Sequence, residues 1–392
     1  MRIELLAFLL LLLPVQFILA QPVWKLSTGD FVGSLSISLD DRYVVVGSLF
    51  VEEGVGRVCL IDRDGNIVWD YMANFPISIA VSASGEYIAV GVGSEGIFYL
   101  SRKGELVWSY EIEGFYLDVQ ISSDGSSIAV STSNGDVYYF NGEGKKLWNY
   151  RFSSQFIPIS MSSDGSFIAV GSSYEVMLLS RLGEILWSSE VDCEVQKIKM
   201  SSDGSYLMAS CEGNLYFLNQ QGEVLWYSEV EGKVLSMDIS TGGGGIAVAS
   251  IFKEGTETKG MVFFYNRYGE LLWSYVTGSW SVVSVSPDGN YVMAGGDGFH
   301  IFNREGKLLY SFSIREAPVH VISLSKDANI AAIGTGGSVI FFSLEEILRQ
   351  NPPERETKPT SLDKFFALVS LIITLLILGI LFFILVRKIS QV

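Results

Sequence analysis

Residues 117–150 read LDVQISSDGSSIAVSTSNGDVYYFNGEGKKLWNY, four short apolar or alternating stretches separated by turn residues. These stretches predict strands over Leu117–Ile121, Ser127–Ser131, Val137–Phe140 and Lys146–Tyr150. An Asp-Gly pair follows the first strand, and a segment that begins with Asn and ends with Gly follows the third. Such turns bond their own backbone and place Gly at positive φ. The segment therefore predicts one four-stranded antiparallel sheet, apolar enough to be covered on both faces.

The same unit recurs along most of the chain. A Trp takes the same place in six units, at spacings of 39 to 47 residues: Trp69, Trp108, Trp148, Trp187, Trp226 and Trp273. A Ser-x-Asp-Gly turn, or a variant of it, begins eight times, at Ser38, Ser82, Ser122, Ser162, Ser201, Ser240, Ser286 and Ser325. A period of this length with four strands per unit is typical of a β-propeller. We therefore predict an all-β fold, an eight-bladed β-propeller of four-stranded antiparallel blades over residues 21–345.

The phase of the repeat predicts how the ring closes. The eighth unit ends after its third strand, Ser338–Phe342, and supplies no Trp strand. Residues 22–27 contain Trp24 and look like the fourth strands of the other units, yet no third strand precedes them. Closing the last blade with this N-terminal strand removes the exposed sheet edges that an open ring would leave.

The N-terminus predicts export. Residues 1–20 begin with Arg2, continue through a Leu-rich stretch and end in Ala20, which is the order of a signal peptide. An uncleaved anchor is the alternative, because Ile18 is larger than a cleavage site prefers.

The C-terminus predicts a membrane anchor. Residues 365–386 are uncharged and long enough for a transmembrane helix. Residues 346–364, with three prolines and mixed charges, predict an extended stalk, and residues 387–392 a short cytoplasmic tail. Basic residues flank the helix on both sides, so the signal peptide decides the orientation. We expect a single-pass protein of the cell membrane with its propeller outside and its C-terminus in the cytoplasm.

Composition excludes several classes of function. The chain has 27 Lys and Arg against 43 Asp and Glu, a net charge of −16, which excludes nucleic acid as the main partner. A hydrophobic share of 48% with only 18% charged residues excludes a disordered chain. Two His and no Cys-x-x-Cys pair leave no recognisable zinc site.

The stretch Leu60–Trp69 resembles the tryptophan-docking motif of propellers related to pyrroloquinoline-quinone (PQQ) dehydrogenases. The resemblance implies that the tryptophans of the fourth strands, Trp24 included, pack between adjacent blades. The Gly-x-x-x-Trp part of the motif holds in six units, at Gly65, Gly104, Gly144, Gly183, Gly222 and Gly269. The turn is one residue shorter than the family's usual form, and Tyr310 replaces Trp in the seventh unit. The Ser-x-Asp-Gly turns are more similar to WD-repeat and surface-layer propellers.

The resemblance assigns no catalytic residue of the PQQ enzymes to a position in this sequence. The PQQ enzymes bind their cofactor with an adjacent Cys pair and a calcium ion held by acidic and amide side chains, whereas Cys59, Cys193 and Cys211 are far apart here. We therefore expect no cofactor, no metal and no catalytic residue. A PQQ- or metal-dependent oxidoreductase, like a quinoprotein dehydrogenase, remains the alternative function.

Two insertions point to a binding face. They lengthen the loop between the second and third strands at Phe50–Gly56 in the first unit and at Ile251–Gly260 in the sixth. In a propeller these loops share a face with the loops between units. The candidate partner-binding residues on that face are Phe31, Phe75, Phe115, Tyr116, Phe156, Trp280, Glu52, Glu53, Lys253 and Glu254. The alternative for the aromatic residues is that they cap the blades as core.

These features together predict a non-catalytic scaffold of the cell envelope that binds a protein or a glycan. A third hypothesis is that the protein is a purely structural component of the envelope.

A disulfide is predicted between Cys193 and Cys211. The first two strands of the fifth unit flank the turn Ser201–Gly204, which places these cysteines nearly opposite each other across the hairpin. An extracytoplasmic compartment permits the oxidation. Cys59 falls on a third strand and should be a buried free thiol. The alternative is that all three cysteines are reduced core residues.

Overall fold

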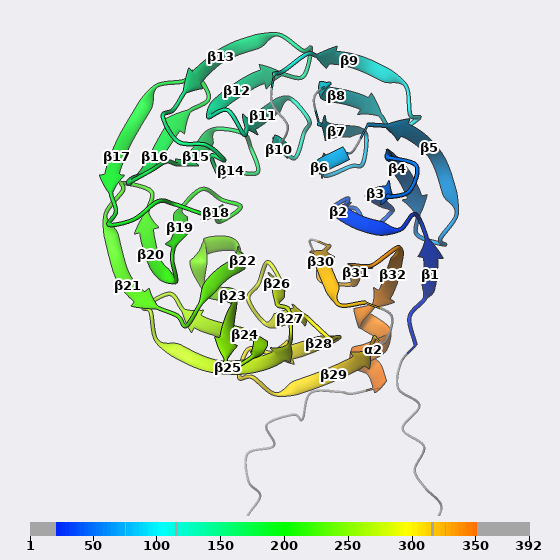
Figure 1. The fold of residues 1–392 in the computed structure, drawn as a ribbon, viewed down its shortest axis with the longest axis vertical. Helices are drawn as coiled ribbons and strands as arrows, with labels where there is room; N and C mark the ends of the chain where they lie inside the picture. Colours follow the sequence, from blue (N-terminus) through cyan, green and yellow to red (C-terminus); the bar gives the residue numbers. More distant parts are fainter. Residues whose placement is uncertain are drawn as a thin grey trace, which may run out of the picture. The chain divides into compact units, whose positions relative to one another are not determined.

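The computed structural model describes residues 21–350 except residues 75, 94, 114–116, 315–316 and 326. In this part of the chain, eight four-stranded antiparallel sheets surround a central axis, with the first strand of each sheet innermost (Figure 1). The predicted eight-bladed propeller is thereby confirmed. The signal peptide, the membrane helix and the tail expected from the sequence lie outside the described residues. Within those residues, no helix has the length and apolar character needed to cross a membrane.

Each blade consists of strands A to D, counted outward from the axis. The strands of blades 1 to 4 are, in order, β2 (Phe31–Ile37), β3 (Tyr43–Phe50), β4 (Val55–Asp62), β5 (Ile67–Ala73); β6 (Pro76–Val81), β7 (Tyr87–Val92), β8 (Gly96–Ser101), β9 (Leu106–Tyr110); β10 (Leu117–Ile121), β11 (Ser127–Thr132), β12 (Asp136–Asn141), β13 (Lys146–Arg151); β14 (Ile159–Met161), β15 (Phe167–Gly171), β16 (Glu175–Ser180) and β17 (Ile185–Glu190). Those of blades 5 to 8 are β18 (Lys197–Met200), β19 (Tyr206–Cys211), β20 (Asn214–Asn219), β21 (Val224–Glu229); β22 (Lys233–Ile239), β23 (Gly245–Glu254), β24 (Glu257–Asn266), β25 (Leu271–Gly278); β26 (Val282–Val285), β27 (Tyr291–Gly295), β28 (Gly298–Asn303), β29 (Leu308–Ser313); β30 (Val319–Leu324), β31 (Ile330–Thr335), β32 (Ser338–Ser343) and β1 (Trp24–Ser27).

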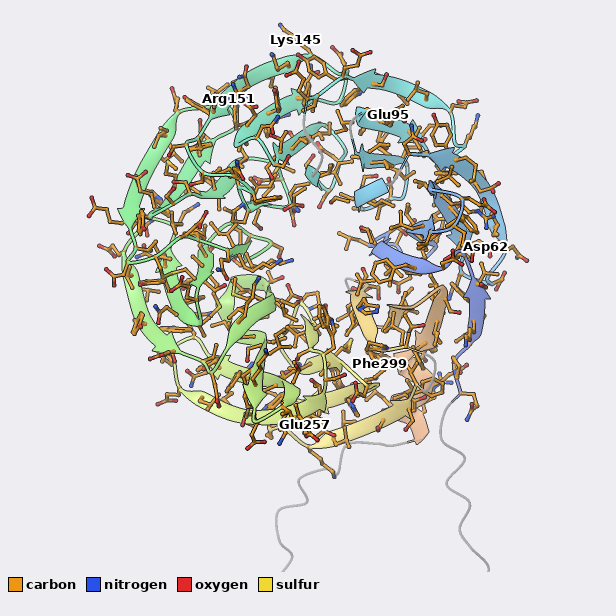
Figure 2. All side chains as sticks on the ribbon, viewed as in Figure 1. Asp62, Glu95, Lys145, Arg151, Glu257 and Phe299 are labelled. Carbon is orange, nitrogen blue, oxygen red and sulfur yellow. A yellow bond between two sulfur atoms is a disulfide. The ribbon has the colours of Figure 1, made fainter. Side chains whose placement is uncertain are left out.

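The core lies between neighbouring blades, where side chains fill the space between the sheets (Figure 2). All six residues of β11 are buried, because this strand sits in the middle of its blade and is covered on both faces. Phe299 of blade 7 and Phe342 of blade 8 stack across the boundary with ring centroids 4.8 Å apart. The strands D are more exposed, since each forms the outer edge of its blade.

The Ser-x-Asp-Gly turns join strands A and B through a repeated hydrogen-bond pattern. In blade 3 the hydroxyl of Ser122 donates to Asp124 over 2.6 Å and accepts the N–H of Ser127 over 3.0 Å. Burial by itself would raise the pKa of Asp124, but hydrogen bonds from Ser122 and Ser126 outweigh it and lower the pKa. The same Ser–Asp bond recurs at Ser38–Asp40, Ser162–Asp164, Ser201–Asp203 and Ser286–Asp288. These aspartates are therefore turn residues.

Each tryptophan of a strand D contacts the next blade. The indole of Trp108 covers Gly144 in the C–D turn of blade 3, and its Nε1 donates a 3.0 Å hydrogen bond to the carbonyl of Gly142. Indole N–H bonds of 2.7 to 3.1 Å link the other pairs: Trp24–Arg63, Trp69–Arg102, Trp148–Arg181, Trp187–Gln220, Trp226–Arg267 and Trp273–Arg304. The repeated Trp thus joins blades both by apolar burial and by one directional bond.

Blade 8 is completed by the N-terminal strand, as its missing fourth strand predicted. β1 pairs with β32 in the antiparallel register Trp24↔Phe341. The place of a C–D turn is taken by helix α2 (Leu344–Gln350), whose Leu344 and Ile347 are buried against the cluster that contains Tyr310. The Tyr in blade 7 therefore faces a helix instead of a glycine turn. Residues 346–350, expected to begin an extended stalk, belong to this helix.

The two insertions form hairpins, not loops. In blade 6, β23 and β24 stay paired as far as Glu254↔Glu257, and in blade 1, β3 and β4 stay paired as far as Phe50↔Val55. In each hairpin the inserted residues lengthen both strands, because backbone pairing satisfies their polar groups and an unpaired loop would not. The expectation that the insertions lengthen the loops was therefore wrong.

Candidate partner-binding face

The predicted charged residues stand at the tips of two blades. Glu52 and Glu53 are exposed in the turn between β3 and β4. Lys253 and Glu254 are exposed at the end of β23, where Glu254 forms an ion pair with Lys259. The two tips belong to blades 1 and 6, so the four residues form two separate groups.

Two of the predicted aromatic residues meet around a histidine. The ring of Phe31 lies 5.0 Å from that of His320, and the ring of Trp280 lies 5.7 Å from the same imidazole. Both aromatic residues are half-buried, and the indole Nε1 of Trp280 is buried without a hydrogen-bond partner. Burial lowers the pKa of His320, so its imidazole is neutral at pH 7. The predicted residues Phe75, Phe115 and Tyr116 lie outside the described residues.

Phe156 belongs to a different part of the face. Its side chain is 60% exposed, and its φ of 55° lies in the left-handed region. It lines a cavity of about 230 Å³ together with Asp118 and Lys197. Burial raises the pKa of Asp118, although a hydrogen bond from Gln120 and the nearby ammonium groups of Lys197 and Lys199 act in the opposite direction.

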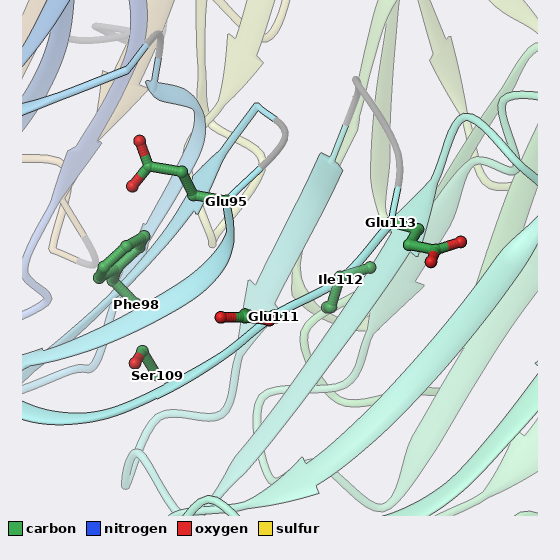
Figure 3. A pocket seen from close by; sticks show the side chains of 6 residues that line it. All are labelled: Glu95, Phe98, Ser109, Glu111, Ile112 and Glu113. Carbon is green, nitrogen blue, oxygen red and sulfur yellow. The ribbon is translucent and has the colours of Figure 1, made fainter.

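The structure adds two acidic cavities that sequence reasoning missed. The first, of about 530 Å³, lies at the end of strand D of blade 2 and is lined by Glu95, Glu111 and Glu113 beside Phe98 and Ile112 (Figure 3). Burial of Ile112 holds the short segment after β9 against the blade, while Glu111 and Glu113 on either side of it remain exposed.

The second acidic cavity, of about 460 Å³, is lined by Glu212, Glu229 and Glu231 between blades 5 and 6, with Lys233 as the one cation in its lining. Glu111 and Glu229 occupy the same repeat position, the third residue after Trp108 and Trp226. Aligning the ends of the D strands on their tryptophans would have revealed this recurrence. The loop face therefore carries carboxylates in at least two separate hollows.

Cys193 and Cys211 form a disulfide, with Cα atoms 5.7 Å apart. They are not the facing strand residues that the hairpin argument assumed. β18 and β19 pair in the register Lys197↔Ser210, so Cys193 lies in the loop before β18 and reaches the last residue of β19. Cys59 is a buried free cysteine on β4, and burial raises its pKa to about 11.

Among the described residues, no three His, Cys, Asp or Glu side chains converge in a way that could hold a metal ion. His300 is half-buried on β28, and its Nδ1 lies 3.1 Å from the hydroxyl of Ser311. These two side chains face each other on the paired strands β28 and β29 of blade 7.

Two families match parts of the chain. The family described as outer membrane protein assembly factor BamB matches residues 21–161, and a family of unknown function (DUF5711) matches residues 132–271. No curated protein matches the chain. The chain is similar to two structures of Sqt1 from Chaetomium thermophilum, one of them bound to the N-terminus of the ribosomal protein L10, with 12% and 13% identity and TM-scores of 0.66 and 0.68.

Those alignments cover 81% and 83% of this chain and 99% of each Sqt1 chain. Sqt1 from Saccharomyces cerevisiae is similar at 12% identity and a TM-score of 0.66, over 82% of this chain and 97% of that one. Identities this low show a shared fold alone. With the docked tryptophans, the eight blades and the BamB match over residues 21–161, this chain is similar to PQQ-like β-propeller repeat proteins.

Proposed function

We propose that this protein is a membrane-tethered, extracytoplasmic scaffold that binds another envelope protein through the face carrying the D–A and B–C loops. The observation that carries the proposal is the pair of acidic hollows, Glu95–Glu111–Glu113 and Glu212–Glu229–Glu231. Carboxylates on a preformed surface attract a partner with clustered Lys and Arg and reject acidic partners. The chemistry favours a protein over a neutral glycan on this face.

Two further observations support the proposal. The exposed ring of Phe156 offers an apolar anchor on the same face. Sqt1 bound to the N-terminus of the ribosomal protein L10 illustrates that a related fold binds a peptide segment.

Photo-crosslinking tests the binding face. A photoreactive phenylalanine analogue placed at position 156 of the full chain in native membranes should give a discrete protein adduct. The double variant Glu111→Lys/Glu113→Lys should lose the adduct, because it reverses the charge of one hollow. The matched variant Glu143→Lys/Glu184→Lys, on exposed C–D turns of the opposite face, should keep it. Equal adducts from both variants, or none from the parent, would reject the proposal.

The proposal of a membrane tether is based on the sequences of residues 1–20 and 365–386. The disulfide between Cys193 and Cys211 supports the proposal that the propeller lies outside the cytoplasm, in an oxidising compartment. In intact cells, a tag after Val392 should be protected from added protease, while a tag within residues 351–364 should be cut. The reverse pattern would contradict the proposed orientation.

A further inference from the structure

A second recess lies on the axis of the ring, at the face opposite to the proposed partner-binding face. Its volume is about 370 Å³, and strands A and A–B turns of seven blades contribute to its lining. The strands A surround the central opening in Figure 1, so side chains from so many blades can meet only on the axis. We call this recess the axial cavity. Its size falls at the lower end of the range for small-molecule pockets.

The rim of the axial cavity is held by hydrogen bonds between blades. The residue after the turn serine donates its backbone N–H to the corresponding carbonyl of the next blade: Ala83 to Ser123 over 2.8 Å, Ser123 to Ser163 over 2.7 Å and Ser163 to Ser202 over 2.9 Å. The hydroxyls of Ser202 and Thr241 continue the chain with a 2.8 Å bond. A rim fixed in this way needs little reorganisation to receive a ligand.

The wall of the axial cavity has a polar side and an apolar side. Ser123, Ser163, Ser202 and Thr241 bring hydroxyl groups from four consecutive blades. Leu39, Pro287 and Leu324, from blades 1, 7 and 8, supply apolar surface on the other side, where Ser284 and Ser325 also line the cavity. A ligand that matches this wall has hydroxyl groups on one side and C–H groups on the other.

One carboxylate in the lining is held in a fixed orientation. Asp238 accepts hydrogen bonds from the hydroxyl of Ser284 over 3.1 Å and from the N–H of Val285 over 2.9 Å. Its other oxygen lies 3.3 Å from the ammonium of Lys199, which offsets its charge. The second carboxylate of the lining, Asp203, is engaged by Ser201 and Ser205. With more carboxylate than cation in the lining, an anionic ligand is disfavoured.

We propose that the axial cavity binds a neutral saccharide of one or two sugar residues. The hydroxyl-bearing wall and the oriented carboxylate of Asp238 hydrogen-bond the sugar hydroxyls, and the leucine and proline side covers a C–H face of the ring. This site is separate from the acidic loop face, and the proposal stands whether or not that face binds a protein.

Ligand-observed NMR on the full chain in a detergent without a sugar headgroup tests the site. The probes are D-glucose, N-acetyl-D-glucosamine, maltose and cellobiose, with D-glucuronate as the anionic control and Nα-acetyl-lysinamide as the peptide-side-chain control. We expect saturable binding of at least one neutral sugar and at least tenfold weaker binding of D-glucuronate. Absence of saturable binding by all four neutral sugars, or preferred binding of either control, would overturn the proposal.

Two variants locate the binding. Ser163→Phe places bulk in the axial cavity and should weaken sugar binding at least tenfold. Ser84→Phe adds the same bulk to an exposed turn position of blade 2, which does not line the cavity, and should leave binding unchanged. Thermal melting reports folding of both, and if Ser163→Phe melts early, Asp238→Asn replaces it with the same expected loss. Equal sugar affinity in folded cavity variants and in the parent would overturn the site.

Discussion

A Cβ atom on Gly65 would lie 2.9 Å from Cγ of Trp24. Trp24 belongs to the N-terminal strand β1, and Gly65 lies in the C–D turn of blade 1, so this contact joins the last blade to the first. The indole fits only because Gly65 has no side chain, and the φ of 87° at Gly65 also favours glycine. The ring is therefore closed twice, by strand pairing within blade 8 and by tryptophan docking onto blade 1.

Gly65→Ala should lower the free energy of unfolding by more than the backbone strain of an alanine at positive φ. Gly54 provides the matched control, because its φ is also positive, at 67°, but nothing lies within 4 Å of a Cβ added there. Gly54→Ala should cost about 1 kcal/mol for the backbone. Gly65→Ala should cost about 1–3 kcal/mol more, the usual cost of overpacking. Denaturant unfolding measures both, and equal losses would argue against a tight Trp24–Gly65 contact.

Deleting residues 22–27 should leave β32 without its outer partner. An unpaired edge of this kind promotes association between molecules, so we expect a lower melting temperature and aggregation. Light scattering during a thermal melt measures both effects. The substitution Trp187→Ala removes a docked indole but leaves every strand paired, and it should lower the melting temperature without comparable aggregation. A deletion that melts like the parent would contradict closure by β1.

Thiol alkylation of the denatured, unreduced protein should label one cysteine, Cys59, and reduction should expose two more. In the folded protein Cys59 should resist alkylation at pH 8, because burial shields it and raises its pKa to about 11. Replacing both Cys193 and Cys211 by Ala should cost about 3 kcal/mol, the typical effect of opening a loop of this length. Three labelled cysteines without reduction would rule out the disulfide.

The two histidines should make stability depend on pH. Burial lowers the pKa of His300 and of His320, so the unfolded chain takes up protons at a higher pH than the folded chain does. Stability should therefore fall as pH drops below about 6.5, the ordinary histidine pKa. Because the sequence contains only 2 His, the variant His300→Gln/His320→Gln should flatten this part of the profile. An unchanged slope in denaturant unfolding would contradict the lowered pKa values.

Adding PQQ and Ca²⁺ to the full chain should give no dye-linked oxidation of alcohols or sugars. We expect this result because the cysteines offer no adjacent pair: Cys59 is alone and Cys193 is joined to Cys211 across 18 positions. Turnover that depends on both PQQ and Ca²⁺ would favour the oxidoreductase alternative over the scaffold.

The sequence by itself determined the number of blades, the four strands of each and the closure by residues 22–27. These features are local or periodic. A Ser-x-Asp-Gly turn bonds within a few residues, as Ser122, Asp124 and Ser127 do, and a repeat read eight times averages out local ambiguity. The strands predicted in residues 117–150 agree with β10 to β13 to within one residue at each end.

Only the tertiary structure decided the rest, because those features depend on contacts between residues far apart in the chain. Backbone pairing makes the insertion after Ile251 a hairpin, and helix α2 packs against Tyr310 because blades 7 and 8 are neighbours. The disulfide joins a loop to a strand end, which hairpin register cannot predict. The axial cavity exists because closing the ring brings Leu39 and Ser163, from blades 1 and 4, to one axis.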